Sequence, residues 1–334
     1  MAKPTHTTYH PNPEQLALFP DISGNTINGV GETAPRRPTP IYWQRPEAIA
    51  HGKLQQWMVE RFIAEPDLAD VHTRFGGRGP RTLEPVAGRR QEKTAPVWTD
   101  EVKAFALAHE ADLVGIAAVD PAWVFKGATM AEPWVIMLGV AMDHAALATA
   151  PTNRAGLEVQ AQYNRGTRAA RALANHIRTL GWNADAHGGP WAGPLTLIPP
   201  ALACGFGELG KHGSIINRRY GSSFRLAAVT TDLPLIADAI DDFAADDFCT
   251  ACRVCADACP PDAIVHDKQM VRGTVKWSVD FDKCIPYFND TLGCGICIAV
   301  CPWSRPGVAP KLATRMTRRR RLGRGDNKMP SNED

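Results

Sequence analysis

Residues 249–260 read CTACRVCADACP, and residues 284–302 read CIPYFNDTLGCGICIAVCP. The first stretch has the spacing C-x2-C-x2-C-x3-C-P, and the second has the spacing C-x9-C-x2-C-x3-C-P. Thiolates are soft ligands that suit iron–sulfur clusters, and a [4Fe–4S] cubane is held by a thiolate at each iron corner. The two runs therefore predict two [4Fe–4S] clusters, and we expect a redox protein.

The run that begins at Cys249 has the spacing of bacterial ferredoxins, in which three cysteines hold one cubane and the fourth reaches the other. This crossover predicts that one cluster is held by Cys249, Cys252, Cys255 and Cys301. It predicts that the other cluster is held by Cys294, Cys297, Cys259 and Cys284. Structural zinc and disulfides are the alternatives. Zinc ribbons favour pairs of cysteines that lie far apart, whereas both runs here end in C-x3-C-P.

The amino-terminal residues contain no recognisable targeting segment. Arg36 and Arg37 are adjacent, but Pro-Thr-Pro follows them in place of an apolar run, so no twin-arginine export signal is expected. No window holds about eighteen consecutive apolar residues, so no transmembrane segment is expected. Thiolates that carry labile clusters fit a reducing compartment. We therefore expect a cytoplasmic protein.

The chain has 334 residues, a formal net charge of +2 and 44% hydrophobic residues. This length accommodates two domains, or one large domain with a small inserted one, and the balanced charge gives no reason to expect nucleic acid or a membrane as partner. The positive excess is local, and we interpret residues 311–334 as a basic flexible tail. Docking of an acidic electron donor and binding of nucleic acid are the alternatives for this tail. Its arginines are Arg315, Arg318, Arg319, Arg320, Arg321 and Arg324.

Three segments have the pattern of helices. Apolar residues recur at helical spacing over residues 52–64. A second helix is expected over residues 99–109, with Thr99 as its N-cap. A long helix is expected over residues 157–180, with Gly181 closing it.

Apolar runs predict buried strands at residues 113–119, 134–142 and 226–235. Helices that alternate with such strands indicate an α/β or α+β core. Residues 1 to about 45 look like an extended arm, and residues 75–90 look like a loop. The chain is therefore divided into an N-terminal arm and irregular region (1–90), a catalytic core (91–245), a ferredoxin-like cluster domain (246–310) and the basic tail (311–334).

Five short motifs follow one another ahead of the cysteine runs. They are YNRG (163–166), ANHIRTLG (174–181), CGFGELGKHG (204–213), YGSSFR (220–225) and TTDLPL (230–235). Together with CIAVCPWS (297–304), their order and spacing resemble those of the cobalamin-dependent reductive dehalogenases. The resemblance covers about half of the chain, and the first 150 residues are only loosely similar to the family.

This resemblance implies a nitroreductase-like α+β core that binds base-off cobalamin beside one of the two clusters. It implies an oxidoreductase that reductively cleaves the carbon–halogen bond of an organohalide. Because the family members without export signals act on haloaromatics, a haloaromatic substrate is expected. An external ferredoxin or flavoprotein reductase would deliver electrons, which the two [4Fe–4S] clusters would relay to Co(I).

In the family a tyrosine donates a proton to carbon, and a nearby basic residue stabilises its phenolate. By motif and spacing these roles fall on Tyr163 and Arg225, although an ordinary helix position and a salt bridge would explain each residue alone. The glycine-rich motif is expected to approach cobalamin through its backbone. The contacts expected there are Gly205, Gly207, Gly210, Lys211 and Gly213.

The same motif is a poor dinucleotide site, because no strand of β-branched residues precedes it and no ribose-binding acid follows. Cys204 is expected to be a small buried residue. An asparagine that some family members place in the substrate pocket falls near Gly189, so chlorinated alkenes are not assumed as substrates. No Asp-x-His-x-x-Gly segment is present, so histidine is not expected as the lower cobalt ligand.

Three alternatives remain open. Epoxyqueuosine reductases also combine cobalamin with two clusters and act on transfer RNA, but their Tyr-x-Arg-Gly-x-Asp-Tyr-His motif supplies an acid. Here YNRG is followed by TRAA at residues 167–170, so that acid is missing. The second alternative is a cobalamin enzyme that reduces another bond, such as an aryl ether. The third is a non-enzymatic electron carrier with two [4Fe–4S] clusters.

Overall fold

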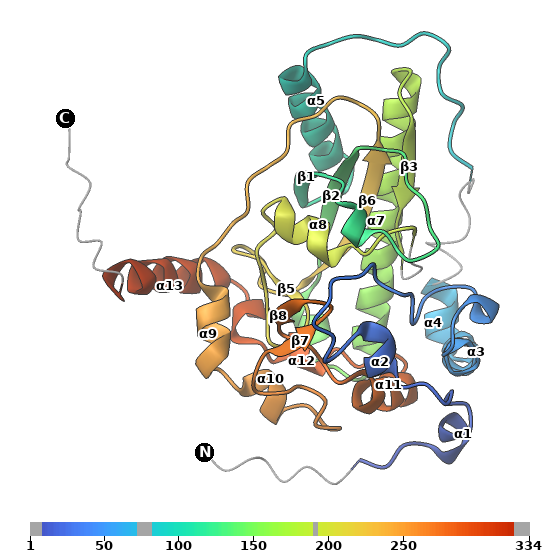
Figure 1. The fold of residues 1–334 in the computed structure, drawn as a ribbon, viewed down its shortest axis with the longest axis vertical. Coiled ribbons are helices and arrows are strands. Elements are labelled where there is room, and N and C mark those ends of the chain that lie inside the picture. Colours follow the sequence, from blue (N-terminus) through green and yellow to red (C-terminus); the bar gives the residue numbers. More distant parts are fainter. Residues whose placement is uncertain (1–8, 72–81, 190–192, 324–334) are drawn as a thin grey trace.

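The computed structural model describes residues 9–71, 82–189 and 193–323. At its centre lies a sheet of β1 (Leu113–Ala118), β2 (Trp134–Ala141), β3 (Ala184–His187) and β6 (Phe224–Thr231). The strand order is β1-β2-β6-β3, and each neighbouring pair is antiparallel. An antiparallel sheet with packed helices is an α+β arrangement, so the predicted α+β class is confirmed (Figure 1).

Both faces of the sheet are covered, which explains why its strands are continuous apolar runs. One face includes Ile136 and packs against α5 (Ala95–Ala108) and α7 (Asn153–Thr179). The other face includes Val135 and packs in a second cluster with residues of α8 (Ile198–Ala203). Adjacent residues of a strand point to opposite faces, so neighbouring residues of β2 fill two separate cores.

Short elements complete the core and build the cluster domain, which we call the cluster module (residues 246–310). The short elements of the core are η3 (Pro121–Trp123), α6 (His144–Leu147), β4 (Glu208–Leu209) and β5 (Ile215–Ile216). Those of the cluster module are α9 (Ala245–Ala251), α10 (Val254–Asp257), β7 (Gln269–Val271), β8 (Thr274–Lys276), α11 (Phe281–Asp290), α12 (Ile296–Ala299) and η4 (Pro302–Ser304). The cysteines lie on these short helices and the turns between them.

The amino-terminal arm is folded onto the cluster module, and the expectation of an extended arm is wrong for the described residues. It contains α1 (Pro13–Leu16) and α2 (Gly24–Asn28), and it is followed along the chain by η1 (Pro46–Ala48), α3 (Gly52–Ala64) and α4 (Pro66–Val71). The Tyr42 hydroxyl donates to Asn289 Oδ1 at 2.9 Å, and the Gly24 amide donates to Asp282 Oδ1 at 2.8 Å. Both acceptors lie on α11, so polar contacts fix the arm to a helix that carries a cysteine.

Two predicted elements need correction, and one is confirmed at both ends. The helix expected over 99–109 is α5, which begins at Ala95 because Pro96 suits the first turn of a helix. Thr99 is therefore inside this helix, where its hydroxyl accepts a hydrogen bond from the Ile236 amide at 2.9 Å. The long helix is α7, which begins one turn earlier than expected, at Asn153. The helix over 52–64 is confirmed as α3.

The predicted end of the last strand and the predicted loop can also be compared with the structure. The strand expected over 226–235 is β6, which ends at Thr231, three residues before Pro234. Proline cannot donate to a sheet ladder, so the apolar run continues past the strand as irregular chain. Of the loop expected over 75–90, residues 82–90 contain no helix or strand, and residues 75–81 lie outside the described residues.

The basic tail begins with a helix where the structure describes it. Residues 309–323 form helix α13 (Ala309–Gly323). Ala309, Ala313 and Met316 are buried in one apolar cluster with residues of the cluster module. Arginine is a good helix former, and the small residues supply a face that packs on the module. Within the described residues, no helix combines the length and the hydropathy that a membrane crossing requires.

Gly221 joins the core to the cluster module. Its φ is +56°, and a Cβ atom there would lie 2.1 Å from the Trp303 carbonyl oxygen. The Ser222 amide next to it donates to Ser304 Oγ at 3.3 Å. The chain therefore needs both a left-handed backbone and the absence of a side chain at this position.

We expect Gly221→Ala to lower the free energy of unfolding by about 3 kcal/mol, because it combines a left-handed alanine with a backbone clash. Gly127→Ala is the matched control, since Gly127 also has a positive φ of +87° but nothing within 4 Å of its Cβ position. That control should lose only about 1 kcal/mol. Thermal unfolding followed by circular dichroism measures both variants. Equal losses in the two proteins would refute the clash.

Candidate active site

The eight cysteines of the cluster module form no disulfide with one another, and they fall into two sets. The first set is Cys249, Cys252, Cys255 and Cys301, whose charges act on one another. The second set is Cys259, Cys284, Cys294 and Cys297, whose charges act on one another, and Cys297 also feels the charge of Cys255 in the first set. Cys301 joins the first set and Cys259 joins the second, as the crossover predicted. Ligation of clusters by these sets remains a prediction.

Burial is the largest cause of the raised thiol pKa values in both sets. Burial raises the pKa of the Cys255 and Cys301 thiols to about 12, and each is raised further by the other members of its set. In the second set, burial raises the pKa of Cys284 to about 12 and that of Cys294 to about 11. Thiols of this kind are poor nucleophiles at neutral pH, but a coordinating metal removes the proton. The two donor sets therefore suit iron–sulfur clusters and do not suit thiol chemistry.

Three cavities meet beside the second set. The cysteine cavity has a volume of about 520 Å³, and its wall includes all four cysteines of the second set together with Gly213 and Trp277. The central cavity has a volume of about 550 Å³ and shares Gly213 and Trp277 with it. The apolar cavity has a volume of about 500 Å³ and includes Cys294. Arg225 lines all three cavities, and no cysteine of the first set lines any of them.

Tyr163 and Arg225 are brought together at the junction of these cavities. The guanidinium carbon of Arg225 lies 5.3 Å from the centre of the Tyr163 ring. Tyr163 is on α7 and Arg225 is on β6, one residue from its start. Gly166 allows this approach, because a Cβ atom there would be only 3.2 Å from Ala227 Cβ on β6. Both residues line the central and apolar cavities.

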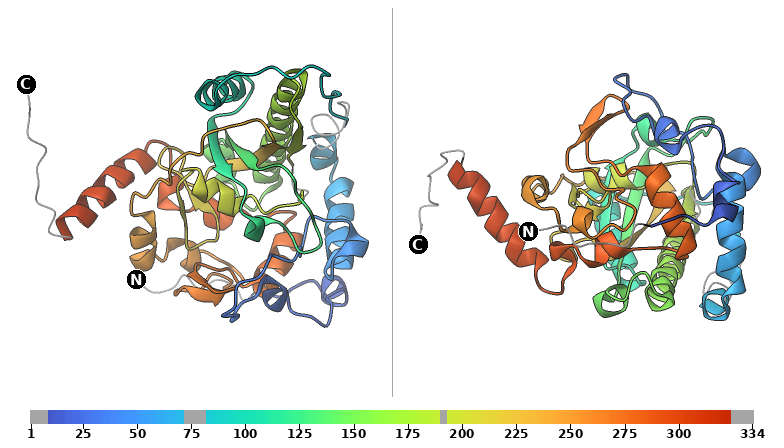
Figure 2. Two further views of the ribbon diagram at one scale, coloured as in Figure 1. Left: turned by 45° about the horizontal axis from the view of Figure 1, so that its top comes forward. Right: turned by 90° about the horizontal axis from the view of Figure 1, so that it is seen from below.

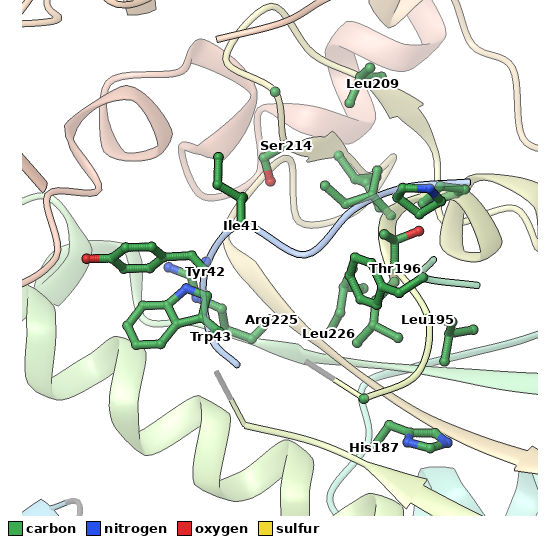
Figure 3. A pocket seen from close by; sticks show the side chains of 18 of the residues that line it. Ile41, Tyr42, Trp43, His187, Leu195, Thr196, Leu209, Ser214, Arg225 and Leu226 are labelled. Atoms are coloured by element: carbon green, nitrogen blue, oxygen red, sulfur yellow. The ribbon is translucent and has the colours of Figure 1, made fainter. Parts of the chain in front are cut away.

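The Arg225 side chain has an unmet hydrogen-bonding capacity. Among the described residues, its Nε atom is buried and has no hydrogen-bond partner. Buried polar groups in proteins are nearly always hydrogen-bonded, so an unpaired one in a cavity wall points to a ligand. Figure 3 shows Arg225 with Tyr42 and Trp43 on one side of the central cavity.

The opposite side of the central cavity was not foreseen from the sequence. His187, at the end of β3, lies there with Leu195 and Thr196 (Figure 3). The His187 Nε2 atom is 2.9 Å from the Thr230 hydroxyl, and burial lowers the pKa of this histidine. A neutral imidazole is therefore expected at this wall. Gly189, which was expected to fall in the substrate pocket, also lines the central cavity.

Some glycines of the glycine-rich motif pack against the chain's own backbone, and one lines the cavities. Gly205 and Gly207 have positive φ angles and face backbone, since a Cβ atom would lie 2.6 Å from Ala239 O or 2.0 Å from Ile216 O. Gly213 lines the central and cysteine cavities. Of the five contacts expected for cobalamin, only Gly213 lines any of the three cavities.

The other two expected contacts lie elsewhere. A Cβ atom on Gly210 would meet the His212 and Ile216 side chains. Lys211 is 2% exposed, its Nζ lies 4.9 Å from the centre of the Trp277 ring, and its charge lowers the pKa of Cys255 in the first set. The positive charge of Lys211 therefore stabilises a thiolate of the first set. Cys204 is buried, with a pKa raised to about 12 by burial, and the expectation of a small buried residue is confirmed.

The arm lines the central cavity. Thr39, Ile41, Tyr42 and Trp43 belong to the wall of that cavity. The arm is held in place from the core side as well, because Arg37 Nε donates to the Val124 carbonyl oxygen at 2.9 Å. The apolar composition of residues 41–43 was the available clue, but their position depends on long-range contacts.

Comparison with known proteins agrees with this arrangement. Residues 248–304 match the 4Fe–4S dicluster domain family, so the ferredoxin-like domain is confirmed. The chain is 31% identical over 208 residues to the tetrachloroethene reductive dehalogenase of Desulfitobacterium hafniense, covering 58% of this chain and 37% of that protein. It is 37% identical over 122 residues to the epoxyqueuosine reductase of Cyclobacterium marinum, covering 31% of this chain and 36% of that protein.

Solved structures extend the similarity over most of the fold. The catabolic reductive dehalogenase NpRdhA in complex with 3-bromo-4-hydroxybenzoic acid matches with a TM-score of 0.65 and 25% identity, covering 79% of this chain and 41% of that chain. A second structure of NpRdhA matches in fold with a TM-score of 0.67 and 22% identity, covering 92% of this chain and 47% of that chain. The chain spans only 37% of the length of the first curated dehalogenase that it matches.

Proposed function

We propose that this chain, which is homologous to the reductive dehalogenases, is an oxidoreductase that removes halogen reductively from a haloaromatic compound. One observation carries the proposal. Tyr163 and Arg225 contact each other in the wall of the apolar cavity, which also contains Cys294, and Arg225 lines the neighbouring cysteine cavity together with all four cysteines of the second set. A proton donor, a fixed cation and a cluster-binding set therefore border neighbouring cavities that share Arg225 and Cys294. We also propose a cytoplasmic location, because labile cluster ligands fit a reducing compartment.

The residues around the central and cysteine cavities fit cobalamin. The two cavities have volumes of about 550 Å³ and 520 Å³ and share wall residues, so together they offer room for a large ligand. Gly188, Gly189 and Gly213 expose backbone in these walls, and Arg225 offers an unpaired Nε donor. Bound there, cobalamin would supply the reduced cobalt that breaks the carbon–halogen bond, with electrons from the two clusters.

The chain itself would supply the proton and control its transfer. The Tyr163 hydroxyl holds the proton that replaces the halogen on carbon, so the net reaction consumes a pair of electrons and one proton and releases halide. The guanidinium of Arg225 lies against the ring, where it would stabilise the negative charge that develops on the phenol oxygen during the transfer. Solvent that reaches the cavity would return a proton to the Tyr163 oxygen before the next turnover.

The apolar cavity is the proposed place for the aromatic substrate. Met58 and Phe62 from α3 and Phe288 from α11 line it, and Tyr163 and Arg225 lie at its wall. An apolar, aromatic-lined cavity of about 500 Å³ suits a planar ring, and the tyrosine and arginine would orient its polar substituents.

A second candidate follows from the similarity to epoxyqueuosine reductases. Against it, the residue after Gly166 is Thr167, whose hydroxyl donates to the Tyr163 carbonyl oxygen at 2.9 Å, and the positions beyond it supply no acid. A cobalamin enzyme that reduces an aryl ether would use the same residues as the dehalogenase. The products identify which of these reactions occurs, since only dehalogenation releases halide.

The first test is electron paramagnetic resonance of anaerobically purified protein produced with cobalamin available. We expect a base-off Co(II) signal together with reducible [4Fe–4S] signals, followed by halide release from haloaromatics. Clusters without cobalamin, even after reconstitution, would contradict the proposal and favour an electron carrier. Cobalamin with clusters but no halide release would favour a different reducible bond.

Replacing Arg225 with methionine is expected to reduce turnover by about a hundredfold, in line with the loss of one fixed donor to a developing anion. Arg225→Lys keeps the charge and should retain part of the activity. Arg168→Met is the control, because Arg168 is on the same helix as Tyr163 but pairs with Glu110 at 2.7 Å at the surface. Steady-state halide release compares the three variants. Equal activity of the methionine and lysine variants would contradict a role for the charge.

A further inference from the structure

Helix α13 has two opposite faces. Ala309, Ala313 and Met316 are buried, and Arg320 follows them on the same side. The Arg320 Nε atom is 2.7 Å from Asp247 Oδ2, and another of its nitrogens pairs with Asp242. This inward face therefore fastens the helix to α9 and to the segment that precedes it.

The outward face of α13 carries only positive charge. Its exposed cations are Lys311, Arg315, Arg318, Arg319 and Arg321. Lys311, Arg315 and Arg318 follow the i, i+4, i+7 spacing that aligns side chains along one stripe. The sequence of α13 contains no Asp or Glu, and no ion pair joins these five cations to another described residue.

The acidic residues on α9 and just before it do not neutralise this face, because they pair with other residues. Asp246 pairs with Lys268 at 2.5 Å, and Asp241 pairs with Arg218 at 2.6 Å. Asp247 is held by the inward-facing Arg320. The five cations of α13 therefore form an uncompensated basic surface, within the part of the chain that the structure describes.

The helix that carries this basic surface packs, through its inward face, beside the first set of cysteines. Cys249 and Cys301 belong to the same apolar cluster as Ala309, Ala313 and Met316. In each view of the ribbon, α13 projects from the body next to α9, which carries Cys249 (Figures 1 and 2). The second set faces the catalytic cavities instead. An electron that reaches the cavity through both sets would therefore enter at the side of α13.

We propose that the outward face of α13 docks a small acidic electron-transfer protein that reduces the cluster held by the first set. The proposal rests on the proposed function, since it assumes that the chain receives electrons for a reductive reaction. One electron leaves the reduced centre of the donor and enters the first cluster, and no bond is formed or broken. A basic stripe attracts an acidic partner over a distance set by ionic strength, and it orients the partner at encounter.

The test removes positive charges from the outward face of α13 without disrupting the helix. Arg315→Gln/Arg318→Gln/Arg319→Gln removes three exposed cations, and glutamine has nearly the helix propensity of arginine. Lys53→Gln/Arg89→Gln/Lys126→Gln is the matched control, because these are three exposed cations outside α13. Circular dichroism and iron content confirm that both proteins are folded and loaded. The probe is a purified acidic [2Fe–2S] ferredoxin, reduced chemically.

Stopped-flow absorbance measures how fast the reduced ferredoxin reduces the clusters of the anaerobic holoprotein. We expect the α13 variant to lose about tenfold in the second-order rate and most of its salt dependence, and the control to match the wild type. Reduction by methyl viologen, a small cation, should be unaffected. Equal ferredoxin rates in wild type and the α13 variant would overturn the proposal, as would failure of the ferredoxin to reduce the wild-type clusters.

Two further outcomes separate the alternatives. Binding of a transfer RNA stem-loop that requires the same arginines, with no effect of the α13 variant on ferredoxin reduction, would assign the surface to nucleic acid and overturn the proposal. Cluster reduction is followed directly and does not depend on dehalogenation. A failure to release halide with every reductant would therefore contradict the proposed function alone.

Discussion

Replacing Tyr163 with phenylalanine is expected to lower halide release by about a hundredfold to ten-thousandfold, while cobalamin and both clusters remain bound. The substitution removes only the hydroxyl that holds the proton. It keeps the ring against which the Arg225 guanidinium packs at 5.3 Å. The helix should also be retained, because the hydrogen bond from Thr167 reaches the Tyr163 backbone and not its side chain.

Tyr220→Phe is the matched control for this prediction. Tyr220 belongs to the apolar cluster of the core, does not line the three cavities, and lies under Arg219 at 4.9 Å in a tyrosine–arginine contact of the same kind. We expect its loss of a hydroxyl to leave turnover unchanged. Cobalamin content, iron content and halide release are measured on both variants. Full activity of the Tyr163 variant would rule out the proton-donor role, and loss of cobalamin would assign the hydroxyl to binding.

The second large effect is expected for Cys297→Ala. Cys297 is a half-buried member of the second set, and desolvation raises its pKa far above the ordinary value. Its thiolate would hold one iron corner of the cluster that borders the cavities, and Cys204, the described cysteine outside both sets, is buried in the core and cannot replace it. The variant should lose that cluster, and halide release should fall to background even with methyl viologen as reductant, because the electron path to the cavity is interrupted.

Cys204→Ser is the control for cysteine loss. The Cys204 thiol is buried and makes its contact to the Ala201 carbonyl oxygen at 3.4 Å, away from both sets. Serine can keep that hydrogen bond, so iron content and turnover should remain at the wild-type level. Iron analysis should give about eight iron atoms per chain for this control and about four for the Cys297 variant. A Cys297 variant with full iron content would refute its assignment as a ligand.

The features that could be predicted from the sequence depend on residues that lie close together along the chain. The cysteine runs constrain their own turns, so the division into two sets followed from spacing alone. The helix of residues 52–64 has apolar residues at helical intervals, and it forms as α3. The proximity of Tyr163 and Arg225 could not come from local pattern, because they lie on different elements. It followed from the resemblance to a family, and the contact at 5.3 Å agrees with it.

The features that were missed depend on contacts between distant segments. The arginines of α13 suggested a flexible tail, since Ala309 and Ala313 are too small to give a strong apolar stripe. The helix is stabilised by packing on the cluster module and by the Arg320 ion pairs. Gly205 and Gly207 were assigned to cobalamin because glycine permits close approach, but the approaching group is the backbone of Ala239 and Ile216. Sequence alone does not distinguish a ligand from the chain's own backbone.

The folded arm has a consequence for engineering new specificity. Its residues 39–43 help to enclose the central cavity, while Tyr42 and Gly24 are bonded to α11, on which Cys284 also lies. A graft of another protein's arm would therefore change the ligand-facing wall and the support of a cluster-binding helix together. Such a chimaera should be made by exchanging the arm and α11 together, so that each acceptor on the helix keeps its own donor on the arm.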